Sequence, residues 1–182
     1  RSGRAQGGAV DLSALRPIPG HSEIVVVTGW RDVGKTSTCQ RAVESYRAAG
    51  LTVSGLLSPG RFVEKQKTGF FAHDLRSGET RLVASAVPGE LSGIQLGSWT
   101  FDARVFDWGN RCLQQADGAD VLVIDELGPL EFKRQTGWVA SFDLLRRKNY
   151  RLALLVIRPE CLEAFSRLGF GFQTQEINLH KE

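Results

Sequence analysis

The chain has 182 residues, of which 42% are hydrophobic and 24% are charged, and its 23 basic and 20 acidic residues give a formal net charge of +3. This composition is typical of one globular domain and excludes a disordered chain. The longest aliphatic run, Leu152 to Ile157, is too short to span a membrane, and the small, scattered net charge gives no reason to expect a nucleic-acid partner.

The cysteines indicate the redox compartment of the chain, and the first residues indicate where its domain begins. Cys39, Cys112 and Cys161 are widely separated and odd in number, so we expect neither a disulfide framework nor a CxxC zinc site, and we infer a reducing, cytoplasmic setting. Residues 1–22 lack both a sustained apolar period and the apolar core of a signal peptide, so we interpret them as a linker or tail before a domain over 23–182. Because the chain contains no Met, we expect a longer polypeptide or a processed start.

The first predicted elements form a βαβ unit. Residues 23–28 are an apolar, largely β-branched run without alternation, which is typical of a strand buried on both faces. A glycine-bounded loop follows, then a helix predicted over 35–49 that ends before Gly50. A second strand is predicted over 52–57, joined to the first by a crossover connection.

The pattern changes between 61 and 86 to short alternating segments separated by turns, which predicts an antiparallel meander inserted into an α/β core. A short strand near 95–99 precedes a helix over 101–116 with Asp102 as its N-cap. The remaining predicted elements are a strand over 121–124, a helix near 136–148, a strand over 151–157, a helix over 159–168 and a strand over 173–179. The expected fold is therefore α/β, with a largely parallel central sheet flanked by helices.

Residues 29–36 read GWRDVGKT and match the phosphate-loop pattern GxxxxGK[ST]. The pattern lies between a predicted strand and a predicted helix, where backbone N–H groups and the helix N-terminus form a cradle for the β- and γ-phosphates. We expect Lys35 to bind the phosphate oxygens and assist catalysis, and Thr36 to bind Mg²⁺. The alternative is a glycine-rich turn with an incidental Lys-Thr pair. The predicted nucleotide-binding residues are Gly29, Trp30, Arg31, Asp32, Val33, Gly34, Lys35, Thr36 and Ser37.

A pair of carboxylates follows the apolar strand predicted over 121–124. In this Walker B arrangement Asp125 is expected to hold the Mg²⁺ shell, and Glu126 to polarise a water for attack on the γ-phosphate. An Asp-Glu pair at a strand end is weak evidence for a Walker B motif on its own. It gains weight here because both motifs follow buried strands, and ligands bind at the carboxyl ends of the strands in α/β sheets.

These motifs resemble the cancer-related, or thermophilic, nucleoside-triphosphatase family. The resemblance covers most of residues 23–180 and rests on three features of the sequence. They are the phosphate loop; Gly55 to Ser58 followed by Thr68-Gly69-Phe70 and Leu75 to Gly78; and residues 124–131, which contain the pattern DExGxxE. It implies a RecA-like P-loop fold and slow Mg²⁺-dependent hydrolysis of several nucleoside triphosphates with little base selectivity. Gly128 and Glu131 belong to this pattern without an assigned role.

The chain departs from the family where Trp30, Arg31 and Asp32 replace small residues and Pro. Asp32 would repel phosphate, so we expect it to point away or to pair with Arg31. Arg158 follows the strand over 151–157 and is either a substitute sensor or arginine finger for the γ-phosphate, or an ordinary strand-end arginine. The histidines are too dispersed to suggest a metal site, so nucleotide-bound Mg²⁺ is the only metal expected.

Three functions remain open from the sequence. The leading hypothesis is a nucleoside-triphosphatase in which Glu126 activates water. A P-loop kinase acting on a small acceptor would use the same cradle, but the chain lacks a compact arginine-rich lid. The third is a nucleotide-dependent switch domain of a longer protein. A nucleoside triphosphate is the expected ligand in each, with a protein partner possible and unidentified.

Overall fold

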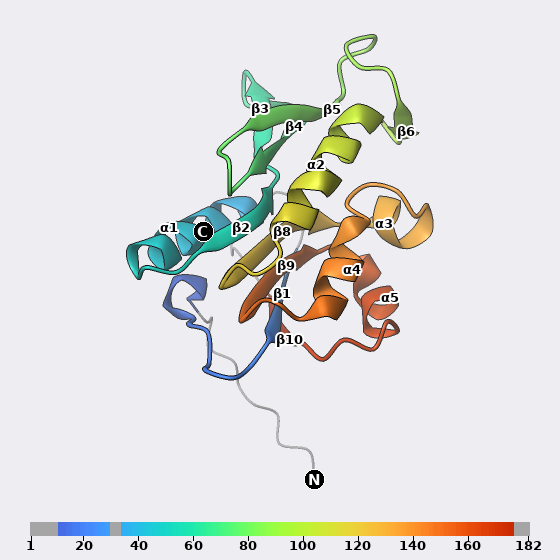
Figure 1. The fold of residues 1–182 in the computed structure, drawn as a ribbon. Helices are drawn as coiled ribbons and strands as arrows, with labels where there is room; N and C mark the ends of the chain where they lie inside the picture. The colour runs from blue at the N-terminus through green and yellow to red at the C-terminus, as the bar shows by residue number, and fades with distance from the viewer. Residues whose placement is uncertain (1–10, 30–33, 177–182) are drawn as a thin grey trace.

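A mixed sheet runs through the computed structural model, which describes residues 11–29 and 34–176 (Figure 1). Its strands are β1 (Glu23–Thr28), β2 (Val53–Leu57), β3 (Gly60–Val63), β4 (Gln66–Asp74), β5 (Thr80–Ser85), β6 (Ile94–Leu96), β7 (Trp99–Phe101), β8 (Val121–Leu127), β9 (Leu152–Ile157) and β10 (Gln173–Glu176). The helices are α1 (Lys35–Ala48), α2 (Ala103–Gln115), α3 (Pro129–Lys133), α4 (Ala140–Arg147) and α5 (Leu162–Ser166), with 3₁₀ turns η1 (Leu12–Ala14) and η2 (Pro159–Cys161).

The parallel strands are covered on both faces, which explains their continuous apolar sequences. Successive side chains of a strand point to opposite faces. Ile24 and Val26 of β1 accordingly pack in one core with α2, α4 and α5, whereas Val25 and Val27 pack in a second core with α1 and η1. Figure 1 shows α1 on one side of the sheet and the other long helices on the opposite side.

The order of the strands decides which strand ends meet. The sheet runs β10-β1-β9-β8-β2-β4-β5-β7-β6, with β3 paired to β4, and its first five strands are parallel. Because β9 lies between β1 and β8, Val156 pairs with Val27 on one side and with Asp125 on the other. The segments that follow β1 and β8 therefore leave the sheet at the same edge, and Val27 and Asp125 lie at matching positions along their strands.

The remaining strands form the antiparallel insert. β4 pairs with the end of β2, β3 and β5 pair with β4, and β7 pairs with β5. The predicted α/β class with an inserted antiparallel meander is confirmed. The single strand predicted near 95–99 was wrong, because Gly97 adopts a left-handed φ of +59° and turns the chain between β6 and β7.

Two further boundaries differ from the predictions after residue 124. β8 continues through Asp125 and Glu126 to Leu127, because Leu127 pairs with Ile157 of β9. A helix predicted near 136–148 begins only at Ala140, since Gly137 has a left-handed φ of +78°. The short helix α3, which Pro129 starts, was not predicted.

The segment before β1 is partly ordered by packing on α1. Leu12 is buried, and the Tyr46 hydroxyl donates a hydrogen bond of 2.6 Å to its carbonyl. The expectation of a linker or tail over 1–22 therefore does not hold for Leu12, whereas the domain boundary at residue 22 stays a prediction. The end of the strand predicted over 173–179 lies outside the described residues.

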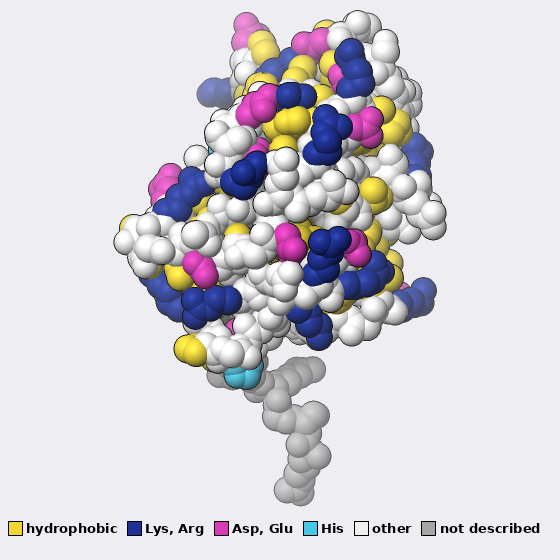
Figure 2. All heavy atoms as spheres, viewed as in Figure 1, with side chains coloured by type: hydrophobic (Ala, Val, Ile, Leu, Met, Phe, Trp, Pro, Cys, Tyr) yellow, Lys and Arg dark blue, Asp and Glu magenta, His cyan; other side chains and the backbone are white. Residues whose placement is uncertain are grey.

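The described helices include none that is long and apolar enough to cross a membrane. On the face drawn in Figure 2, lysine and arginine side chains are interspersed with aspartate and glutamate side chains over much of the surface. This distribution agrees with the scattered charge of the sequence.

Candidate active site

The structure brings Thr36 and Asp125 together. Asp125, near the end of β8, is almost fully buried, and its Oδ2 accepts a hydrogen bond of 2.7 Å from the Thr36 hydroxyl in the first turn of α1. The same oxygen accepts a bond of 3.1 Å from the Ser58 backbone N–H, and the Ser58 hydroxyl donates to the Asp125 carbonyl. Ser58 was not predicted as a site residue; its signals in the sequence are its place in the Gly55–Ser58 segment and its position directly after a buried strand.

Lys35 lies at the start of α1, where the predicted phosphate loop ends. Its side chain is buried, and Nζ donates a hydrogen bond of 2.9 Å to the carbonyl of Gly29 at the loop's start. Gly34 precedes α1 with a left-handed φ of +80°, a conformation that favours glycine. Ser37 is exposed on α1. The other predicted loop residues, Trp30, Arg31, Asp32 and Val33, lie outside the described residues, as does the expected pairing of Asp32 with Arg31.

Asp125 is a buried carboxylate with opposing influences on its charge. Burial raises the pKa of Asp125, while hydrogen bonds from Thr36 and Ser58 and the positive charge of Lys35 act in the opposite direction. A buried carboxylate is costly unless it is paired or coordinates a metal. The carboxylate oxygens of Asp125 and the hydroxyl oxygen of Thr36 are hard donors of the kind that Mg²⁺ takes in addition to water and phosphate.

Glu126 lies beside this pair and is only partly covered, with 36% of its side chain exposed. Burial raises its pKa and the neighbouring Asp125 adds to the rise, whereas Lys35 and Arg158 lower it. Arg158 directly follows β9, and its Nε lies 3.8 Å from a carboxylate oxygen of Glu126 and 2.8 Å from one of Glu160. The contact with Glu160 is the shorter of the two, and the role of Arg158, as a γ-phosphate sensor or as a strand-end arginine, stays a prediction.

Glu131 holds the segment that follows β8. Its Oε1 accepts a hydrogen bond of 2.9 Å from the Gly128 N–H, and its Oε2 accepts one of 3.4 Å from the Trp138 N–H. Burial raises the pKa of Glu131 to about 8. A Cβ atom on Gly137 would lie 2.0 Å from Oε2, so glycine is required there. The second glutamate of DExGxxE thus joins the end of β8 to the turn before α4.

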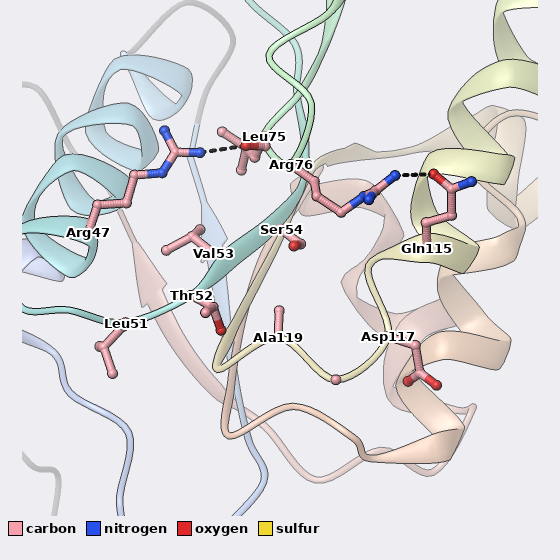
Figure 3. Close-up of a pocket in the computed structure, with 11 residues that line it drawn as sticks. Arg47, Leu51, Thr52, Val53, Ser54, Leu75, Arg76, Gln115, Asp117 and Ala119 are labelled. Atoms are coloured by element: carbon pink, nitrogen blue, oxygen red, sulfur yellow. Dashed lines mark hydrogen bonds between the residues drawn. The ribbon is translucent and has the colours of Figure 1, made fainter.

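A separate depression lies at the opposite end of the parallel strands. It has a volume of about 510 Å³ and is lined by residues around the starts of β2 and β8 and the ends of α1 and α2 (Figure 3). Arg47 donates a hydrogen bond of 2.5 Å to the Leu75 carbonyl, and Arg76 donates to the Gln115 side chain. This depression is not part of the candidate active site.

The sequence matches the model of a protein family described as NTPase over residues 24–170, which is most of the chain. The chain belongs to this NTPase family. Curated relatives include two proteins named nucleoside-triphosphatase THEP1. The one from Caldivirga maquilingensis is 24% identical over 154 residues, covering 85% of this chain and 87% of the relative. The one from Methanosarcina barkeri is 24% identical over 156 residues, with the same coverage.

Solved structures of two proteins share the fold. The solution structure of a human cancer-related nucleoside triphosphatase aligns with a TM-score of 0.65 at 22% identity, covering 88% of this chain and 90% of that one. The crystal structure of THEP1 from the hyperthermophile Aquifex aeolicus aligns with a TM-score of 0.61 at 18% identity, covering 85% and 90%. This NTPase chain therefore has the fold that the resemblance of its motifs implied.

Proposed function

We propose that this chain binds a nucleoside triphosphate with Mg²⁺ and hydrolyses it slowly to the diphosphate and phosphate, with little selectivity for the base. The observation that carries the proposal is the 2.7 Å contact between Thr36 and Asp125, beside the buried Lys35. Lys35 and Thr36 come from α1, which follows the buried strand β1, and Asp125 comes from the end of the buried strand β8. Family membership and the printed names of the relatives support the same conclusion.

Magnesium would be held by Thr36 and Asp125. When bound with nucleotide, the ion neutralises charge on the β- and γ-phosphate oxygens. When nucleotide binds, Lys35 would exchange its bond to the Gly29 carbonyl for bonds to those phosphate oxygens. The backbone N–H groups at the start of α1 contribute further donors for an anion.

Glu126 would serve as the general base. Its side chain is partly exposed, so a water molecule can reach it, and its raised pKa improves its ability to accept a proton. Arg158 lies close enough to hold the carboxylate in place. The position of Glu126 directly after Asp125, the expected metal ligand, supports transfer to water rather than to a small acceptor.

The cellular compartment of the protein is also a proposal. Cys39, Cys112 and Cys161 are all buried and free. Three unpaired cysteines fit a reducing compartment, which we propose is the cytoplasm.

Phosphate release from ATP, GTP, CTP and UTP tests the function, with Mg²⁺ and then with excess chelator. We expect release from all four nucleotides, equal in amount to the diphosphate formed, and no release with chelator. Formation of diphosphate that depends on an added hydroxyl acceptor would support a kinase instead. Tight binding without turnover would support a nucleotide-dependent switch.

A further inference from the structure

The inserted hairpin of β3 and β4 begins directly over the candidate active site. β2 ends at Leu57, and the next residue, Ser58, donates two hydrogen bonds to Asp125. β3 then begins at Gly60 and pairs with β4, which carries the Thr68-Gly69-Phe70 segment. In Figure 1 this hairpin projects beyond the parallel strands. Side chains on it can therefore reach the edge of the sheet where phosphates are expected.

Lys67 on β4 is folded against this hairpin rather than extended into solvent. A Cβ atom on Gly60 would lie 3.1 Å from Cε of Lys67 and 2.8 Å from the ring of Phe62, so the missing side chain at Gly60 leaves room for both. The Lys67 ammonium lies 4.1 Å from the centre of the Phe70 ring, which is a favourable position for a cation. The side chain is half-buried in this position.

The charge of Lys67 acts on the carboxylates of the site. It lowers the pKa of Asp125 and also that of Glu126, in both cases against the effect of burial. The place of the ammonium follows from the fold: the end of the Lys67 side chain lies beside Gly60, two residues after Ser58, whose backbone N–H and hydroxyl donate to Asp125. Lys65, in contrast, is exposed at the turn of the hairpin with a φ of +66°.

We propose that Lys67 is a further catalytic residue, whose ammonium binds the γ-phosphoryl oxygens from the hairpin while Lys35 binds from the phosphate loop. The inference rests on the proposed function. In the reaction, the water oxygen forms a bond to the γ-phosphorus and Glu126 takes a water proton. The bond from the γ-phosphorus to the bridging oxygen breaks, and its electron pair leaves with the nucleoside diphosphate. Lys67 transfers no proton; it stabilises the charge on the phosphoryl group as that group moves.

A cation at this place favours the triphosphate over the diphosphate. Lys35 contacts oxygens that the product partly retains, whereas Lys67 contacts only the group that is removed. The terminal phosphate is therefore recognised by a residue outside the phosphate-loop motif.

Lys67→Ala, Lys67→Arg and the hairpin control Lys65→Ala test this assignment. For Lys67→Ala we expect kcat to fall roughly tenfold to a thousandfold. Its affinity for a non-hydrolysable triphosphate analogue with Mg²⁺ should fall about tenfold, while its affinity for the diphosphate stays within about twofold. Lys67→Arg should restore most of the activity, and Lys65→Ala should match the wild type.

The binding measurements separate this inference from the proposed function. If the wild type releases no phosphate, the proposed function fails, and the ratio of triphosphate to diphosphate affinity still decides the role of Lys67. An unchanged ratio in Lys67→Ala overturns the inference. Equal losses of affinity for both nucleotides, together with a lower melting temperature, would show that Lys67 acts only on the structure of the hairpin and would also overturn it.

Discussion

Replacing Glu131 with Gln removes a buried acid while keeping its shape. Burial raises the pKa of Glu131 to about 8, from its ordinary value of 4.5. Between these two values the folded protein holds the proton more tightly than the unfolded chain does. The contribution of this group to stability is therefore fully present below about pH 4.5, and it is lost as the pH rises toward 8.

The size of the effect follows from the pKa difference. At about 1.4 kcal/mol per pKa unit, the wild type should lose roughly 4 kcal/mol relative to Glu131→Gln between pH 5 and pH 9. At pH 5 the variant should be the less stable protein by about 1 kcal/mol. Its amide offers one acceptor oxygen, so the buried N–H groups of Gly128 and Trp138 can no longer both be satisfied.

Urea unfolding followed by tryptophan fluorescence measures both proteins at pH 5, 7 and 9. The expected result is a difference in the free energy of unfolding that reverses in favour of the variant as the pH rises. If the free energies of unfolding of the two proteins change in parallel over the whole pH range, Glu131 does not have a raised pKa. The account of Glu131 as a buried acid bonded to Gly128 would then be wrong.

Four further substitutions, one of them a control, address the sheet and the phosphate site. Gly55→Ala places a Cβ 1.8 Å from the Val123 carbonyl at a φ of +123°, whereas Gly78→Ala, at +79°, meets open space. Thermal unfolding should show about 1 kcal/mol lost for Gly78→Ala and several times that for Gly55→Ala; equal losses would contradict the close pairing of β2 with β8. Lys35→Ala should weaken triphosphate binding at least tenfold in a titration, and unchanged affinity would remove Lys35 from the site. Thr36→Val should raise the Mg²⁺ concentration needed for half-maximal turnover without lowering the melting temperature, and an unaltered Mg²⁺ dependence would exclude the hydroxyl as a ligand.

The core of the site was predictable because its signals are local. The phosphate-loop pattern is a continuous stretch of sequence, and Asp125 directly follows an apolar run. Parallel strands bring their carboxyl ends to one edge, so the contact between Thr36 and Asp125 follows from the fold class. The roles of these residues nevertheless remain proposals that the measurements above test.

The remaining contacts depend on pairing between distant segments. Ser58 reaches Asp125 only because β2 lies beside β8, and the order of the sheet cannot be read from either strand alone. The role proposed for Lys67 depends on the fold of a hairpin whose register includes a bulge. The partner of Glu131 at Trp138 depends on the left-handed turn at Gly137, which a helical pattern in the sequence obscured.

The turnover of Glu126→Gln tests the central claim most directly. Phosphate release is measured for the wild type and the variant with saturating ATP and Mg²⁺, alongside a binding titration of both with ATP. The account predicts that kcat falls by roughly a hundredfold or more while the affinity for ATP stays within about threefold. Turnover equal to that of the wild type would contradict the assignment of Glu126 as the base that activates water.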